Sequence, residues 1–160
     1  MQYKIFKFKR VKSTNNTAIR IIKETNCNLG MVISETQVKG KGQYGRKWIS
    51  FKGNLFVTFF NKLNKSKLKI SSITKYNCLL VKELLSKFTK KKILFKKPND
   101  LLIDKKKISG ILQEVILIKE KNFLITGIGI NITKNPIIKN YPATNLQEVI
   151  KKSISKTIVE

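Results

Sequence analysis

The sequence contains no histidine, and only two of its 160 residues are cysteines. The absence of histidine excludes every mechanism in which an imidazole acts as acid, base or metal ligand. Cys27 and Cys78 stand far apart and form no C-x-x-C pair, which argues against a zinc site. Isolated cysteines are typical of a reducing compartment, and we therefore expect a cytoplasmic protein.

Long apolar segments are also missing. No stretch reaches the ~20 apolar residues of a membrane-spanning helix, and the first ten residues, MQYKIFKFKR, lack the apolar core of a signal peptide. We therefore expect no membrane association. With 41% apolar residues the chain has the composition of a globular protein, and its length suits a single domain over residues 1–160.

Acidic residues are scarce: nine Asp and Glu stand against 34 Lys and Arg, which gives a formal net charge of +25. Clustered cations would suit a nucleic acid, because they displace counterions from its phosphates. Compositional bias is the alternative, because the excess is mostly Lys, spreads along the whole chain and accompanies abundant Ile and Asn. Neither an RNA-recognition motif nor a helix-turn-helix pattern stands out, so we expect no nucleic-acid partner.

Hydrophobic periodicity predicts strands interspersed with three helices, and hence a mixed sheet in an α/β (α+β) fold. The first helix runs from a cap at Ser13, Thr14 or Asn15 to about Glu24. The second covers residues 71–88, and a final amphipathic helix begins at Asn145 and continues to the last residues. The strand-like segments are residues 4–9, 30–36, 54–60, 93–95, 101–104, 108–118 and 122–132.

The stretch GKGQYGRKW, residues 40–48, fits the dinucleotide-binding pattern G-x-G-x-x-G through Gly40, Gly42 and Gly45. That site also requires a helix at the third glycine and an acidic residue ~20 positions later. Neither is present, since no helical period follows and no Asp or Glu lies between residues 36 and 82. Two interpretations remain: a cradle in which main-chain N–H groups and basic side chains bind an anion, and a plain glycine-rich connection.

Three further stretches place polar residues and glycines beside strand-like segments. KKPND, residues 96–100, has a proline that fixes a bend, followed by Asn99 and Asp100. Lys107 comes seven residues later in KKISGILQE, residues 106–114, and Gly110 follows it. GIGIN, residues 127–131, places two glycines before Asn131 in an apolar strand, where glycine usually marks a bulge or a close contact.

The order STN (residues 13–15), ETQVKGKGQYGRKW (35–48), KKPND, KKISGILQE and GIGIN resembles the catalytic domain of biotin–protein ligases. The pattern of that family reads S-T-N, Q-x-x-G-R-G-R-x-G-R-x-W, K-W-P-N-D, K-[IL]-x-G-I-L-x-E and G-[IVA]-G-[IL]-N. The match covers residues 13–146, and five ordered motifs are far more specific than any single one.

The resemblance implies an enzyme, a biotin–[acetyl-CoA-carboxylase] ligase, with the largely antiparallel sheet and flanking helices of class II aminoacyl-tRNA synthetases and biotin–lipoate ligases. It implies that biotin and ATP form biotinyl-AMP, with Mg²⁺ as cofactor. Biotin would then pass to a lysine of a biotin carboxyl carrier domain, as in acetyl-CoA carboxylase. The alternatives are a lipoate or octanoyl ligase or transferase of the same fold and, outside the enzymes, a basic nucleic-acid-binding module.

The resemblance also implies roles for individual residues. The catalytic residues would be Lys107, Arg46 and Asp100, with Asp100 holding Mg²⁺ or orienting the carrier lysine. Lys107 would lie between the biotin carboxylate and the α-phosphate, because two anions react only with a cation between them. The implied biotin-binding residues are Ser13, Thr14, Asn15, Gln37, Lys41, Gly42, Gln43, Lys107 and Gly110. The implied nucleotide-binding residues are Gly40, Gly45, Arg46, Trp48, Asn99 and Asn131.

Several of these residues also have a structural interpretation. Residues 13–15 suit a helix cap, Asn99 and Asp100 suit a turn after proline, and Trp48 suits a hydrophobic core.

The chain departs from the family pattern at three positions. Lys41 and Gln43 stand where the family has loop arginines, and Lys97 stands where it has tryptophan. We expect Gln43 to let the activated intermediate escape more readily. The motif positions also lead us to expect neither an N-terminal winged-helix domain nor a C-terminal β-barrel domain.

Overall fold

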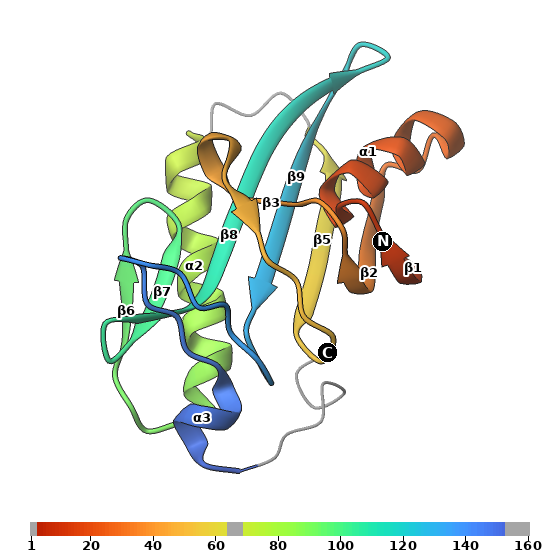
Figure 1. The fold of residues 1–160 in the computed structure, drawn as a ribbon. Coiled ribbons are helices and arrows are strands. Elements are labelled where there is room, and N and C mark those ends of the chain that lie inside the picture. Colours follow the sequence, from red (N-terminus) through yellow and green to blue (C-terminus); the bar gives the residue numbers. More distant parts are fainter. Residues whose placement is uncertain (1–2, 64–68, 153–160) are drawn as a thin grey trace.

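Seven strands form one mixed sheet in a computed structural model that describes residues 3–63 and 69–152 (Figure 1). All neighbouring strands are antiparallel except the first pair, which is parallel, so the predicted mixed and largely antiparallel sheet is confirmed. The strands in spatial order are β1 (Lys4–Val11), β2 (Leu29–Gln37), β5 (Leu55–Lys62), β9 (Lys121–Ile130), β8 (Lys106–Ile118), β7 (Asp100–Ile103) and β6 (Ile93–Lys96).

Two helices cover opposite faces of this sheet. Val32 packs under α1 (Thr14–Thr25), whereas its neighbour Ile33 belongs to the core against α2 (Ile70–Ser86). Successive side chains of a strand point to opposite faces, so these two residues place the helices on different sides. The predicted helices at both places are confirmed. None of the described helices is long and apolar enough to cross a membrane.

Helix α2 does not bury the row of residues with the most obvious apolar spacing. That row is Ile73, Tyr76, Leu80, Leu84 and Phe88, and within it Tyr76 and Leu80 are 61% and 45% exposed. The buried row instead contains small or medium side chains, namely Thr74, Cys78, Val81 and Leu85. Small side chains let a helix approach a sheet closely, which apolar spacing alone does not reveal.

The last described helix, α3 (Leu146–Ile150), is shorter than predicted. Asn145 caps it by accepting a hydrogen bond from the N–H of Glu148 at 2.9 Å. The helix ends where Lys151 adopts a left-handed conformation, with φ of 55°. The prediction of a helix continuing beyond this point is therefore wrong at residue 151, and residues 153–160 lie outside the described part.

The glycine-rich stretch forms a small hairpin rather than a strand–helix turn. Its parts are β3 (Gly40–Lys41), the short 3-10 turn η1 (Gln43–Gly45) and β4 (Lys47–Trp48). The hairpin lies across the front of β8 and β9 in Figure 1. No helix follows Gly45, in agreement with the rejection of a dinucleotide fold.

Candidate active site

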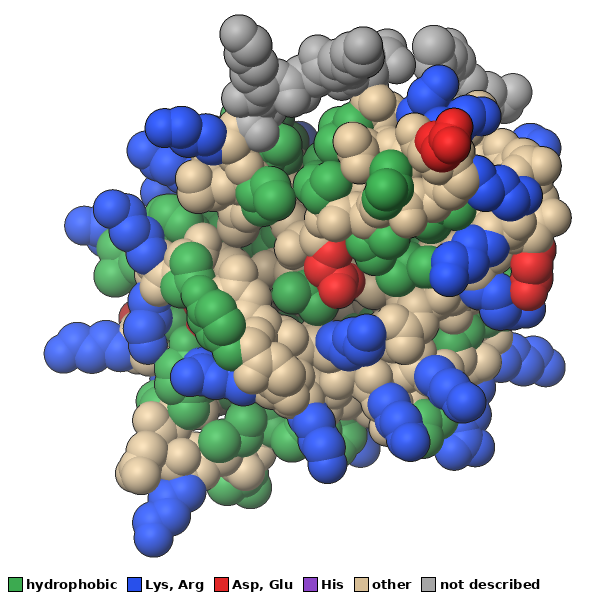
Figure 2. Space-filling model, turned by 90° about the horizontal axis from the view of Figure 1, so that it is seen from above, with side chains coloured by type: hydrophobic (Ala, Val, Ile, Leu, Met, Phe, Trp, Pro, Cys, Tyr) green, Lys and Arg blue, Asp and Glu red, His purple; other side chains and the backbone are tan. Residues whose placement is uncertain are grey.

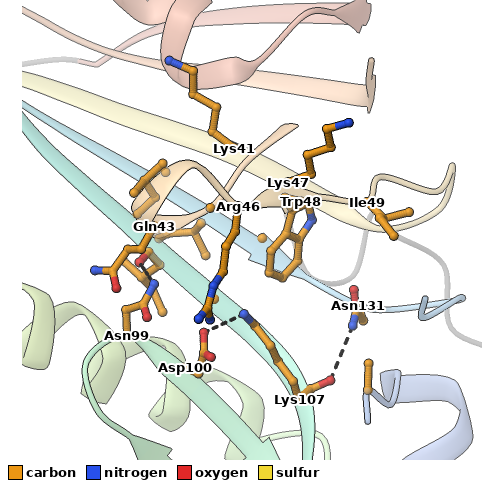
Figure 3. A pocket seen from close by; sticks show the side chains of 18 of the residues that line it. Lys41, Gln43, Arg46, Lys47, Trp48, Ile49, Asn99, Asp100, Lys107 and Asn131 are labelled. Carbon is orange, nitrogen blue, oxygen red and sulfur yellow. Dashed lines mark hydrogen bonds and ion pairs between the residues drawn. The ribbon is translucent and has the colours of Figure 1, made fainter. Parts of the chain in front are cut away.

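A cavity of about 620 Å³ lies under the hairpin and carries most of the residues that the motifs select. The cavity is lined by the start of α1, the turn between β6 and β7, the glycine-containing parts of β8 and β9, and residues 131–143. Figure 3 shows how side chains from these segments converge. Of the site residues predicted from sequence, the lining includes Ser13, Thr14, Asn15, Gln37, Lys41, Gly42, Gln43, Arg46, Trp48, Asn99, Asp100, Lys107, Gly110 and Asn131.

Trp48 forms one wall of the cavity because two glycines make room for its indole ring. A Cβ on Gly129 would lie 2.6 Å from the indole carbons Cε2 and Cζ2, and one on Gly110 would lie 2.8 Å from Cζ3. The close contact predicted for the glycines of GIGIN is therefore confirmed at Gly129. Trp48 is only partly buried and does not belong to either hydrophobic core. Its indole Nε1 is buried and has no hydrogen-bond partner.

The start of α1 is anchored to the strand that leads into the hairpin. Ser13 caps the helix through its side-chain oxygen, so the predicted capping role is confirmed. Gln37 accepts hydrogen bonds from the main-chain N–H and the hydroxyl of Thr14, at 2.8 and 3.0 Å. The Gln37 amide then donates to the Ser50 hydroxyl at 3.2 Å. These bonds fix the helix start against the base of the hairpin.

Lys107 lies inside the cavity and forms an ion pair with Asp100. Its Nζ is 2.7 Å from Asp100 Oδ1, and the two side chains are only 20% and 12% exposed. The same amine lies 5.1 Å from the centre of the Trp48 ring. A partly buried cation of this kind interacts more strongly with an anion than a solvated lysine does. Its neighbour Lys106 is instead at the surface, paired with Glu148 at 3.4 Å.

Tyr141, which the sequence motifs did not select, completes the surroundings of Asp100. Its hydroxyl donates a hydrogen bond to Asp100 Oδ2. Its ring faces two amines, Lys96 Nζ at 4.5 Å and Lys107 Nζ at 5.5 Å. Burial, followed by the hydrogen bond to Asp100, raises the pKa of Tyr141 above its ordinary value, so the hydroxyl stays a donor. Pro142 follows Tyr141 in KNYPATN, residues 139–145, but no glycine or charge pattern there marks the tyrosine.

The segment that carries Tyr141 reaches the site through main-chain bonds to Lys107. The N–H of Lys107 donates to Pro142 O, and its carbonyl accepts from the N–H of Thr144, both at 2.9 Å. Asn131 strengthens the junction by donating to Thr144 O at 3.1 Å. Its Oδ1 is buried without a partner and lines the cavity, so it is free to bind a donor.

The basic residues of the hairpin separate into two groups. In Figure 3, Arg46 points into the cavity toward Asp100, whereas the amines of Lys41 and Lys47 point away from it. The register explains this, because Lys41 pairs with Lys47 while Gly40 pairs with Trp48, and successive pairs face opposite sides. Arg46 is therefore the hairpin cation that faces the Asp100–Lys107 pair.

Other predicted residues have structural rather than lining roles. Gly40 and Gly45 are not among the lining residues. Gly40 lies where a Cβ would be 2.5 Å from the carbonyl of Trp48, and Gly45 sits at the exposed tip with φ of 73°. Asn99 is buried and donates a hydrogen bond to Ile111 O at 2.7 Å, which holds the turn against β8. Asn99 also lines the cavity. Lys97, where the family pattern has tryptophan, is exposed at the rim.

Asp100 does not have the surroundings of a metal ligand. One of its oxygens is paired with an ammonium group and the other accepts from a hydroxyl. Among the described residues, no group of three or more acidic, cysteine or histidine side chains could hold a metal ion. Mg²⁺ requires near-octahedral oxygen ligands, so these residues do not fit a protein-held magnesium site.

Several other lining residues were not predicted to be site residues; most stand inside the quoted motifs, but Ile49, Pro136, Ile138, Tyr141 and Ala143 lie outside them. The remaining lining residues are Tyr44, Lys47, Ile49, Lys96, Lys97, Pro98, Ile111, Leu112, Gly127, Ile128, Gly129, Pro136, Ile138, Tyr141 and Ala143.

The cavity thus holds a partly buried lysine–carboxylate pair under a basic hairpin, on a mixed sheet with one helix start beside it. Residues 7–131 match the Biotin/lipoate A/B protein ligase family. The chain belongs to this family.

Individual relatives agree with this membership. The bifunctional ligase/repressor BirA of Escherichia coli strain K12 is 32% identical over 102 residues, which cover 62% of this chain and 32% of the relative. BirA of Bacillus subtilis strain 168 is 26% identical over 154 residues, which cover 91% of this chain and 47% of the relative. The chain therefore spans less than half the length of these two relatives.

Solved structures show the same fold. The biotin protein ligase of Aquifex aeolicus, in complex with biotin and ATP, has a TM-score of 0.80 and 33% identity, and the match covers 98% of this chain and 65% of that one. The P. falciparum protein LipL1, in complex with lipoate, has a TM-score of 0.63 and 13% identity over 99% of this chain and 60% of that one. The second likeness concerns the fold alone.

Proposed function

We propose that this chain attaches biotin to a specific lysine of a biotin carboxyl carrier domain, with ATP and through biotinyl-AMP. It would thus be a biotin–[acetyl-CoA-carboxylase] ligase. The observation that carries the proposal is the Lys107 amine inside the cavity, where it faces Asp100 at 2.7 Å and lies close to the hairpin. The relative of known structure with biotin and ATP bound, which aligns over nearly the whole chain, supports the choice of substrates.

In the first step, an oxygen of the biotin carboxylate attacks the α-phosphorus of ATP. The new O–P bond forms as the bond to the bridging oxygen breaks, and pyrophosphate leaves with that electron pair. Lys107 reduces the repulsion between the two anions and stabilises the charge of the transition state. The Lys107 ammonium group has three N–H donors and is paired with a single carboxylate, so it can also bind substrate oxygens. Such a donor contributes roughly 100- to 1000-fold to the rate.

In the second step, the amine of the carrier lysine attacks the acyl carbon, an amide bond forms and AMP leaves. The incoming amine must be oriented toward that carbon. Asp100 can accept a hydrogen bond from it, because a carboxylate has about four acceptor positions and only two are used here. Tyr141 holds the carboxylate in place for this role.

The two ends of the cavity suit the two substrates. Residues 13–15 and Gln37 would surround the ureido ring of biotin, whose N–H and C=O groups require polar partners. Trp48 Nε1 and Asn131 Oδ1, which are buried and unpaired, would bind the nucleotide together with Arg46. Buried polar atoms without partners are uncommon in proteins, and a bound ligand is one reason for them. We assign no step to Mg²⁺, because Asp100 is the one carboxylate among the described lining residues and it already faces the Lys107 ammonium group.

The partner domain would meet a strongly basic surface. Figure 2 shows Lys and Arg side chains projecting all around one face, with only a few Asp and Glu among them. The net charge of +25 would attract an acidic carrier domain and speed the encounter. Both cysteines, Cys27 and Cys78, are free and buried, in keeping with the cytoplasmic location that we infer.

The test is ATP-dependent pyrophosphate release by the purified chain, with biotin and with lipoate as separate substrates. The proposal predicts release with biotin. Release with lipoate alone would replace it with the alternative activity of the same family. Salt-sensitive binding of duplex DNA, without substrate-dependent ATP turnover, would instead favour the nucleic-acid-binding alternative.

A further inference from the structure

The amide of Asn15, which lines the cavity, is held between two polar side chains. Asn15 is 3% exposed, and its Nδ2 donates to Glu114 Oε2 at 2.8 Å. Its Oδ1 accepts from the hydroxyl of Thr58 at 2.7 Å. Gly127 leaves the space that this arrangement needs, because a Cβ there would lie 2.2 Å from Asn15 Oδ1.

Glu114 alone decides which way this amide faces. The hydroxyl of Thr58 can donate or accept, so it would tolerate either orientation of Asn15. A carboxylate only accepts, so Glu114 requires the NH₂ group of Asn15 on its side and the oxygen on the side of Thr58. The hydrogen bonds therefore allow only one orientation of the Asn15 amide, whereas a neutral amide side chain at position 114 would allow both orientations.

A fixed amide at this place matches one kind of acyl head group. After the two bonds, Asn15 keeps one N–H and one lone pair, and it lines the cavity. A cyclic urea has both N–H donors and a carbonyl acceptor, whereas a dithiolane ring or an alkyl chain has neither. Leaving buried polar groups unpaired lowers affinity by roughly 10- to 100-fold.

We propose that Glu114 is a positioning residue that locks the Asn15 amide and so selects a hydrogen-bonding ureido head over an apolar acyl head. This inference rests on the proposed function, because it concerns the substrate of the same cavity. Glu114 lies on β8 four residues after Gly110, on the same face of the sheet, but its side chain is not among those lining the cavity. It acts through Asn15 and not by contact with the substrate.

The test compares Glu114→Gln with the wild type in pyrophosphate release with biotin and with lipoate. The substitution removes the acceptor-only group and keeps the size of the side chain. We expect the KM for biotin to rise about 10-fold with kcat little changed, and the rate with lipoate to stay the same. Glu83→Gln, the same change at an exposed residue of α2, is the matched control and should leave KM and kcat unchanged with both substrates.

Each outcome bears on the inference. An equal loss with both substrates would show a structural role only, and an unchanged KM for biotin would show no role; either result overturns it. If Glu114→Gln does not fold, Gly127→Ala is the second variant, because its Cβ displaces the Asn15 amide from the other side. It should also raise the KM for biotin without changing the rate with lipoate. If the wild-type chain releases no pyrophosphate with biotin, the proposed function itself is contradicted. If the wild type is active and Glu114→Gln has the same KM for biotin, only the role of Glu114 is contradicted.

Discussion

Replacing Gly129 by alanine should impair the site much more than the fold. The added Cβ would lie 2.6 Å from two indole carbons of Trp48, about 1 Å closer than carbon atoms normally approach. Trp48 belongs to a two-residue strand of the small hairpin, so its indole can move away while the seven-stranded sheet remains. Overpacking costs about 1–3 kcal/mol, and here we expect that cost as weaker binding of ATP, by roughly 5- to 150-fold.

The assay is the ATP dependence of pyrophosphate release, together with thermal unfolding of the same variant. Gly30→Ala is the matched control, because its Cβ would lie 2.5 Å from the ring of Phe60, which is fully buried in the core beside α1. That variant should lose stability but keep its KM for ATP. An unchanged KM for ATP in Gly129→Ala would refute the placement of the Trp48 indole beside the nucleotide.

Three further predictions concern single side chains. Gln43→Arg should reduce the escape of biotinyl-AMP by roughly 10-fold, since arginine binds phosphate through a charged fork; equal labelling of bystander proteins by both forms would contradict this. Tyr141→Phe should lower the free energy of unfolding by about 1–2 kcal/mol, because Asp100 loses a hydrogen bond; an unchanged denaturant midpoint would disagree. Burial, followed by the charge of Asp100, raises the pKa of Cys78 to about 12. At pH 8 only about one thiol in 10⁴ is ionised, so alkylation detected by mass should follow unfolding, and rapid labelling of the native chain would oppose this.

The motifs predicted many of the residues that line the cavity, because those residues are marked by their chemical type and their close neighbours in sequence. Lys107 and Asp100 were selected from two separate motifs, and the antiparallel pairing of β7 with β8 brings them together. The glycines of β8 and β9 were expected to mark a close contact, and Trp48 and Asn15 provide it. The strands themselves followed from alternating and aromatic residues, which fit a half-buried sheet.

The rest depended on tertiary contacts that no local pattern records. Tyr141 reaches Asp100 because residues 142–144 pair with the main chain around Lys107, a contact between segments about 35 positions apart in the chain. Glu114 was part of a motif, but its hydrogen bond from Asn15 depends on the placement of α1 beside β8. The buried face of α2 was not the most apolar one, because close packing favoured Thr74 and Cys78.

The amine of Lys107 is central to the proposed chemistry, and mass spectrometry of a biotin carboxyl carrier domain tests its role directly. The domain is incubated with biotin, Mg-ATP and either the wild-type chain, Lys107→Ala or Lys106→Ala, whose surface amine pairs with Glu148. The account predicts one added biotin with the wild type and with Lys106→Ala, and a rate roughly 100- to 1000-fold lower with Lys107→Ala. An unmodified carrier with the wild type, or equal rates for all three proteins, would contradict it.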